Sequence, residues 1–138
     1  MTDEALISSK VLAGIRSLTE LKVEFDHLPT KGLPMLSMQT LTGTPVERRF
    51  KSGGYIGNYR FALYLRQQAE DNASRLDAEQ VLKTLAGQVE KLPLALGASI
   101  ALLGITQDTL PAKVSSDEAY DDQQVTFTLK YKKGRNHA

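Results

Sequence analysis

The sequence predicts an α+β fold, in which a mainly antiparallel sheet carries two amphipathic helices packed on one face. Two segments repeat apolar residues at helical spacing. Several others alternate apolar and polar residues with the period of two that is typical of half-buried strands. Short turns containing Pro or Gly join most of these strands, which favours antiparallel pairing. The 138 residues fit a single domain, 1–138, with residues 133–138 as a flexible tail.

The first helix is expected near the N-terminus. Its apolar positions recur at steps of four, four and three on one helical face: Ile7, Val11, Ile15 and Leu18. Three strand segments follow, at residues 21–25, 33–41 and 46–51. The first alternates apolar and charged residues, and Pro34 places the second segment's beginning at a strand start or a sheet edge.

The clearest strand runs over residues 59–66. Its odd-numbered residues are aromatic or aliphatic and are expected to face the core: Tyr59, Phe61, Leu63 and Leu65. The second helix follows over residues 76–92 and ends at Pro93. Its apolar residues repeat at steps of four, three, four and three: Ala78, Leu82, Leu85, Val89 and Leu92.

The C-terminal third is less regular. Residues 99–105 are expected to form a buried strand, although their apolar pattern also fits a helix. Residues 108–122 are polar and acidic and are expected to form a solvated loop. The last strand covers residues 124–132 and points a set of apolar residues to one face: Val125, Phe127, Leu129 and Tyr131.

Composition narrows the classes of function. The chain has 17 Lys+Arg and 16 Asp+Glu, and this net charge of +1 argues against a dedicated nucleic-acid binder. It has no cysteine, which excludes disulfides, thiolate metal sites and a cysteine nucleophile. Two histidines, His27 and His137, are too few for a multi-histidine metal site. The acidic N-terminus and the short apolar runs predict a protein made in the cytoplasm, with no export signal and no membrane partner.

Patterns that carry chemistry are weak in this sequence. The glycine-rich segment 53–57 leads into a strand and not into a helix, so a flexible hairpin is favoured over a phosphate-binding loop. His27 would need Glu24 or Asp26 to orient it as a general base, and a surface histidine is the simpler interpretation. We therefore expect no catalytic residue, no metal site and no cofactor.

Two clusters of charge have a more specific pattern. Arg48, Arg49 and Lys51 belong to one expected hairpin. An acidic cluster falls in segment 108–122 and lacks the spacing of a calcium loop: Asp117, Glu118, Asp121 and Asp122. If the two clusters lie on opposite sides of one subunit, they complement each other between neighbouring copies, and such head-to-tail contacts generate rings. Two solvated polar loops are the alternative interpretation.

Four pieces of the sequence together resemble a known family. The first is the N-terminal helix with a short strand and the loop 28–34, and the second is the charged hairpin 46–54. The third is the strand 59–66 with the helix 76–92 after a polar linker, and the fourth is the closing strand 120–131. In this order they resemble the small tail terminator proteins of long-tailed phages, which are often labelled minor capsid proteins.

The resemblance implies a structural protein of the phage virion that performs no catalysis. Such proteins form a ring, usually of six subunits, at the head-proximal end of the tail. The ring caps the tail tube, stops its polymerisation and provides the head–tail joining surface. The implied partners are other copies of the chain, the tail tube protein and a head completion or connector protein. DNA would pass through the ring without sequence-specific binding.

The same resemblance makes segments 43–58 and 108–122 the expected interface segments. Arg48, Arg49 and Lys51 are expected to form charge pairs with a partner. Tyr55 is expected to be a buried anchor of the kind that interfaces favour. The acidic residues expected at the interface are the four of the second segment: Asp117, Glu118, Asp121 and Asp122.

Two other classes of function remain open at this point. A small α+β enzyme or ligand binder with a cone-shaped cavity, as in the nuclear-transport-factor-like fold, would need a polar pair in an apolar pocket, and His27 with Glu24 is the candidate. A nucleic-acid-binding adaptor would use the basic C-terminal run: Lys130, Lys132, Lys133 and Arg135.

Overall fold

A computed structural model of the chain describes residues 3–28, 31, 34–42, 46–68, 72–116 and 119–134. It has two helices and seven strands, which confirms the predicted α+β class. The elements follow one another as α1 (Asp3–Leu18), β1 (Val23–Phe25), β2 (Met35–Thr40), β3 (Val46–Arg49), β4 (Tyr55–Gln68), α2 (Asn72–Val89), β5 (Ile100–Gln107), β6 (Ala112–Ser116) and β7 (Tyr120–Lys133).

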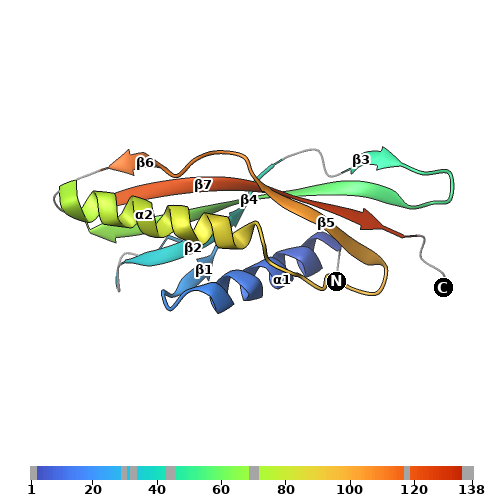
Figure 1. The fold of residues 1–138 in the computed structure, drawn as a ribbon, viewed down its shortest axis with the longest axis horizontal. Coiled ribbons are helices and arrows are strands. Elements are labelled where there is room, and N and C mark those ends of the chain that lie inside the picture. Colours follow the sequence, from blue (N-terminus) through green and yellow to red (C-terminus); the bar gives the residue numbers. More distant parts are fainter. Residues whose placement is uncertain are drawn as a thin grey trace.

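Two long strands form the centre of the sheet. β4 and β7 have 14 residues each and pair antiparallel along their whole length. At about 3.4 Å per residue, a strand of this length spans roughly 48 Å. The β4–β7 pair therefore runs along the longest dimension of the molecule (Figure 1).

Shorter strands line both outer edges of the central pair. The strand order is β1-β2-β4-β7-β5, with β3 also paired to β4 and β6 also paired to β7. β2 lies along residues 61–66 of β4, whereas β3 lies along residues 55–57. β5 lies along residues 127–133 of β7, and β6 along residues 121–124. Each edge is thus shared by two short strands placed one after the other.

The observed strands correct several expectations. β4 begins at Tyr55 and β7 at Tyr120, so both are longer than the alternating segments predicted. The solvated loop expected over residues 108–122 is wrong, because the segment contains β6 and the first residues of β7. Residues 100–107 do form a strand, β5, but it alternates between buried and exposed because it lies beside β7 at an edge.

Strand direction is a further correction. β1 and β2 pair parallel, although consecutive strands were expected to be antiparallel. The residues between them, 26–34, exceed what a tight hairpin needs, and Asp26 adopts a φ of 54° directly after β1. At the other end of the sheet, Gly134 N donates to the carbonyl of Ser99 at 2.7 Å. Of the expected flexible tail, residues 135–138 lie outside the described residues.

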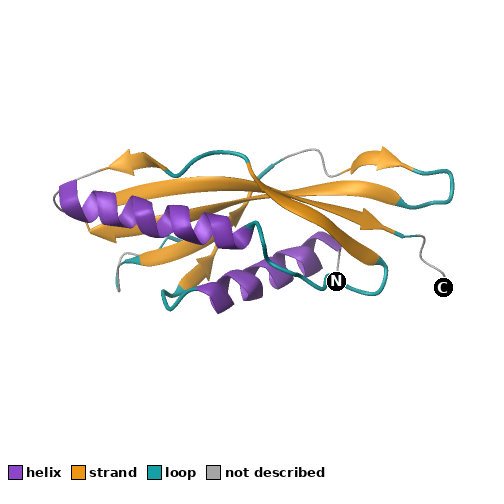
Figure 2. Cartoon of the chain, viewed as in Figure 1, coloured by secondary structure: helices purple, strands orange, loops and turns teal. Residues whose placement is uncertain are grey.

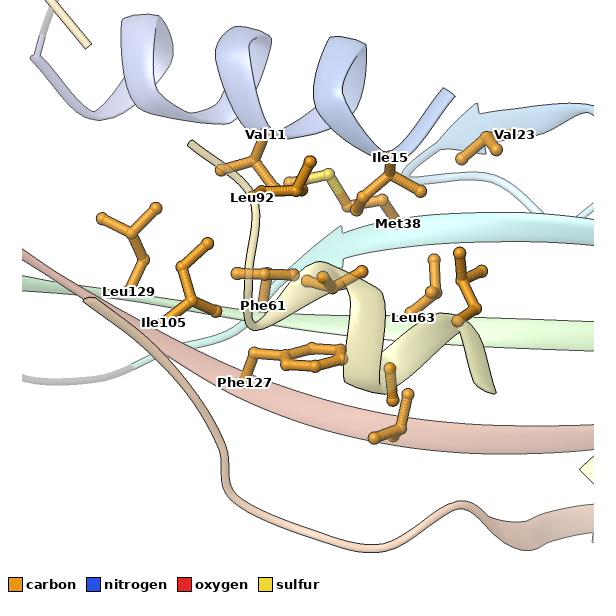
Figure 3. Close-up of a cluster of buried hydrophobic side chains, with 14 of the residues drawn as sticks. Val11, Ile15, Val23, Met38, Phe61, Leu63, Leu92, Ile105, Phe127 and Leu129 are labelled. Atoms are coloured by element: carbon orange, nitrogen blue, oxygen red, sulfur yellow. The ribbon is translucent and has the colours of Figure 1, made fainter. Parts of the chain in front are cut away.

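Both helices pack on one face of the sheet and enclose the core (Figure 2). The odd-numbered residues of β4 and β7 form the floor of this core, as predicted. Phe61 and Phe127 are fully buried, and their rings stack with centroids 5.0 Å apart. Val11 and Ile15 of α1 are equally buried and point toward the sheet (Figure 3).

A glycine lets α1 approach the segment that follows α2. A Cβ built on Gly14 would lie 2.9 Å from Leu94 Cδ2 and 3.2 Å from Leu92 Cδ1. Glycine within a helix costs roughly 1 kcal/mol relative to alanine. The close packing of Leu92 and Leu94 against α1 offsets this cost.

The stacked aromatic pair makes a direct test of the core. Replacing Phe127 with Ala should lower the free energy of unfolding by about 3–5 kcal/mol, because the change leaves a cavity at a fully buried site. Phe127→Leu should cost less, since it fills more of the same volume. Urea unfolding measures both, with Leu110→Ala as the control at a residue that is 76% exposed. A loss below about 1 kcal/mol for Phe127→Ala would contradict the packing described.

Candidate assembly interface

One end of the sheet projects beyond both helices (Figure 1). We call this end the basic arm and define it as residues 46–58 and 130–134. It contains β3, the turn that follows, the first residues of β4 and the end of β7. The turn is closed by hydrogen bonds from Phe50 N to Gly54 O (2.9 Å) and from Gly53 N to Phe50 O (3.1 Å). Gly53 has a φ of 97°, which favours glycine there.

Gly54 fixes the hairpin tightly against β7. A Cβ at this position would lie 2.6 Å from the carbonyl oxygen of Lys133. A backbone atom cannot move aside as a side chain can, so no other residue fits here without separating the two strands. The arm is therefore held as a three-stranded unit by β3, β4 and β7.

The arm concentrates positive charge. It contains a single acid, Glu47, whose carboxylate pairs with Lys130 Nζ at 3.0 Å and accepts a hydrogen bond from Asn58. The hydrogen bond from Lys130 lowers the pKa of Glu47. Against this one acid stand six bases: Arg48, Arg49, Lys51, Lys130, Lys132 and Lys133. Among the described residues, no ion pair is made by Arg48, Arg49, Lys51 or Lys132.

Aromatic rings hold several of these cations in place. On the face of the sheet away from the helices, Arg48 Cζ lies 5.5 Å and Lys132 Nζ 5.3 Å from the centroid of the Phe50 ring. On the helix-bearing face, Arg49 Cζ lies 5.7 Å from the centroid of the Tyr55 ring. Cations placed over aromatic faces are attracted by the ring electrons. The arm thus presents ordered charges on both of its faces.

The sequence predicts that four residues of the charged hairpin lie at an interface, and the structure places all four on the arm: Arg48, Arg49, Lys51 and Tyr55. Arg48, Arg49 and Lys51 are exposed. Tyr55 is half-buried and packs edge-on against Tyr131, with ring centroids 6.0 Å apart. Whether these residues contact a partner stays a prediction.

The structure places the acidic residues differently from the expectation. Asp121 and Asp122 lie in β7 and are 0% and 5% exposed. The Asp122 carboxylate accepts hydrogen bonds from Arg66 Nε (2.8 Å) and Nη2 (2.9 Å), a bidentate ion pair across β4 and β7. Arg66 also stacks over Tyr120, with Cζ 4.7 Å from the ring centroid. Asp122 is therefore neutralised within the subunit, and Asp117 and Glu118 lie outside the described residues.

A second surface, which sequence reasoning missed, lies along α1. We call it the α1–β1 groove: an open hollow of about 500 Å³ lined by Glu4, Ala5, Ser8, Ser9, Leu12 and Phe25. Its lining is mostly apolar, and the Phe25 side chain is 38% exposed at the end of β1. The only sequence signal was an aromatic residue at the end of a short edge strand. The groove itself arises from tertiary packing of α1 beside β1.

Charge near the groove is negative. The Tyr59 hydroxyl accepts a hydrogen bond from Ser8 Oγ at 2.8 Å and lies 2.9 Å from Thr40 Oγ1. Burial raises the pKa of Tyr59, and the carboxylates of Glu4 and Asp26 add to the rise. Both carboxylates therefore act on the same hydroxyl beside the groove. Neither forms an ion pair with any described residue.

The enzyme hypothesis requires His27 and Glu24 to lie together in an apolar pocket, and the structure does not place them so. His27 is exposed, and Glu24 pairs with Lys22 Nζ at 3.2 Å. Neither residue lines the α1–β1 groove. Within the described residues no group of three or more His, Asp or Glu side chains could hold a metal ion. Neither described helix has the length and apolar character needed to cross a membrane.

Comparison with known proteins gives a fold but no family. The chain matches no protein-family model and no curated protein. A chain in the virion of a native gene transfer agent particle aligns with 91% of this chain and 94% of its own length, with a TM-score of 0.58 and 14% identity. The bacteriophage SPP1 gp17 protein aligns with 98% of this chain and 91% of its own, with a TM-score of 0.43 and 15% identity. The first alignment shows a shared fold.

The Arg66–Asp122 pair is predicted to stabilise the subunit itself. Asp122→Ala should lower the free energy of unfolding by about 3 kcal/mol, because it leaves a largely buried guanidinium without its counter-ion. The matched control is Glu24→Ala, which removes the more exposed pair with Lys22 and should cost about 1 kcal/mol or less. Equal small losses in urea unfolding for both variants would contradict this role.

The Tyr59 hydroxyl gives a prediction for alkaline pH. Because the folded state raises the pKa of Tyr59, its contribution to stability is complete below the ordinary value of 10.0 and is lost as pH rises through the raised value. Tyr59→Phe should be less stable than wild type near neutral pH, since two hydrogen-bonded contacts are lost. The difference should shrink above pH 10. A difference in unfolding free energy that is constant from pH 8 to 11 would contradict the shift.

Proposed function

We propose that this chain is a structural protein of a phage virion, a tail terminator whose ring caps the tail tube and joins it to the head. One observation carries the proposal: an ordered arm with six bases and one acid projects beyond the part of the sheet whose core the two helices cover. The fold shared with a chain of a virion particle supports it. Exposed, ordered charge at a projecting strand end is suited to contact with another protein.

The proposed mechanism is physical and breaks no covalent bond. Copies of the chain associate head to tail, so that one surface of each subunit contacts a different surface of the next, and the rotation closes into a ring. One side of the ring matches the end of the tail tube. The other side differs from it, so no further tube subunit adds, and a head completion or connector protein binds there instead. DNA passes through the ring without sequence-specific contacts.

The arm is the proposed interface segment for these contacts. Arg48, Arg49 and Lys51 are exposed and steer the arm toward acidic surfaces of a partner. The Arg49 guanidinium lies over the ring of Tyr55, and this ring gives the arm an aromatic anchor. The half-buried state of Tyr55 leaves part of its ring for a partner to cover.

Charge reversal on the arm tests the proposal. Arg48→Glu/Arg49→Glu should raise the concentration needed for association by about a hundredfold, because like charges then face each other. Tails assembled with this variant should fail to join heads. Sedimentation measures the mass of the protein alone, and electron microscopy measures its binding to tail tubes of the phage that encodes it. Because both residues are exposed, the free energy of unfolding should change by less than about 0.5 kcal/mol.

The matched control reverses two exposed bases on the helices, Lys10→Glu/Lys83→Glu. This variant has the same net charge as the arm variant and should still assemble. Normal assembly and joining by the arm variant would refute the interface assignment. A wild-type chain that stays monomeric alone and also ignores tail tubes would refute the ring.

A further inference from the structure

We infer that Phe50 on the basic arm of one subunit inserts into the α1–β1 groove of a second copy of the chain. The inference rests on the proposed ring and identifies its two contacting surfaces. It also replaces the acidic side of the contact that the sequence suggested. Asp121 and Asp122 are buried in β7, and we place the receiving surface at the α1–β1 groove instead.

The groove has the chemistry of a receptor for an aromatic side chain. Ala5, Leu12 and the exposed edge of Phe25 supply an apolar lining, and the hollow is open to the surface. No residue of the arm lines it within the same subunit. Glu4 lines the groove and Asp26 directly follows Phe25 of the lining, and neither carboxylate forms an ion pair among the described residues. An apolar hollow with an anionic rim favours an apolar group that is flanked by cations.

The arm carries that combination. Arg48 of β3 and Lys132 of β7 lie over the ring of Phe50, and both pair with Ile56 of the strand between them, β4. The register places Arg48 and Lys132 on the face away from the helices, so no helix of the same subunit covers them. Insertion of Phe50 would bring the two cations to the rim, opposite Glu4 and Asp26. Arg48 and Lys132 would then pair with Glu4 and Asp26 between subunits.

Addition of a whole strand to β1 is the competing form of contact, and the structure disfavours it. The carbonyl of Val23, the first residue of β1, already accepts hydrogen bonds from Arg16 Nε (3.1 Å) and Nη2 (2.8 Å). Arg16 thereby covers part of the edge that a partner strand would use. Side-chain insertion beside β1 needs none of these backbone groups.

The contact joins two unlike surfaces, and we place the arm and the groove of one subunit on two different neighbours. The arm lies beyond the ends of the helices (Figure 1), whereas the groove is lined by residues of α1 and β1. A subunit whose arm fills one neighbour still offers its own groove to another. Contacts of this heterologous kind propagate and close only as a ring.

Site-specific cross-linking tests the inference, because the chain has no cysteine of its own. Lys51→Cys, next to Phe50, and Ser9→Cys, in the groove lining, keep both proposed contact side chains. They are prepared as separate proteins, one with a size tag, then mixed and treated with a short bismaleimide. The expected product is a dimer that contains one chain of each kind. A chain with both substitutions should yield a ladder of higher oligomers. The control mixture pairs Lys51→Cys with Leu110→Cys, which is 76% exposed on another surface, and should cross-link at least tenfold less.

The outcomes separate the inference from the proposed function. If wild type sediments above the mass of a monomer and the mixture cross-links no better than the control, the inference fails and the ring survives. Cross-linking of Ser9→Cys with itself alone would show a groove-to-groove contact and would also overturn it. A wild-type chain that remains monomeric alone and with tail tubes overturns both. Lys51 and Ser9 are both exposed, so neither substitution should disturb folding.

Discussion

The fold depends on the uninterrupted pairing of β4 with β7. The two strands pair at 14 positions, from Tyr55 with Lys133 to Gln68 with Tyr120, and every other strand except β1 is hydrogen-bonded directly to one of them. Because side chains alternate along a strand, one face of this ribbon stays continuous from end to end. In the middle it supplies Phe61 and Phe127 to the core, and at one end it supplies the surface of the arm. Core and arm are therefore parts of one rigid element, and a movement of the arm would disturb the pairing that holds the core.

The concentration of positive charge on the arm destabilises an isolated subunit. Like charges on neighbouring strands repel, and the Glu47–Lys130 pair offsets this for Lys130. The backbone pairing to β7, the close fit of Gly54 and the rings of Phe50 and Tyr55 hold the arm together despite this repulsion. Folding of the subunit gains nothing from such a concentration of charge. Its presence on an ordered projection is explained by what the arm contacts, which is why the arm carries the proposed function.

Local patterns in the sequence were sufficient for the fold class, both helices and the centre of each long strand. They could not show that β4 starts at Tyr55, because Gly57 and Asn58 interrupt the alternation and only pairing with β7 makes the segment a strand. The alternation of apolar and polar residues is the same in parallel and antiparallel strands, so it could not predict the parallel β1–β2 pair. The acidic segment was read as solvated because the counter-ion of Asp122, Arg66, lies 56 residues away in the sequence. Phe25 was the one sequence signal for the α1–β1 groove, since the hollow itself exists only where α1 packs beside β1.

Pairing within the subunit divides the charged residues into two groups. Asp122, Glu47 and Glu24 are matched inside the chain. The two proposed surfaces carry opposite charge, with cations on the arm and the carboxylates of Glu4 and Asp26 beside the groove. Two arms repel each other, and so do two grooves, so the charge that attracts arm to groove also disfavours contacts of arm with arm and of groove with groove. A ring requires this asymmetry, because each subunit must prefer the unlike surface of its neighbour over a second copy of its own. Opposite charge on the arm and at the groove is thus a property that a head-to-tail assembly needs and that a monomer does not.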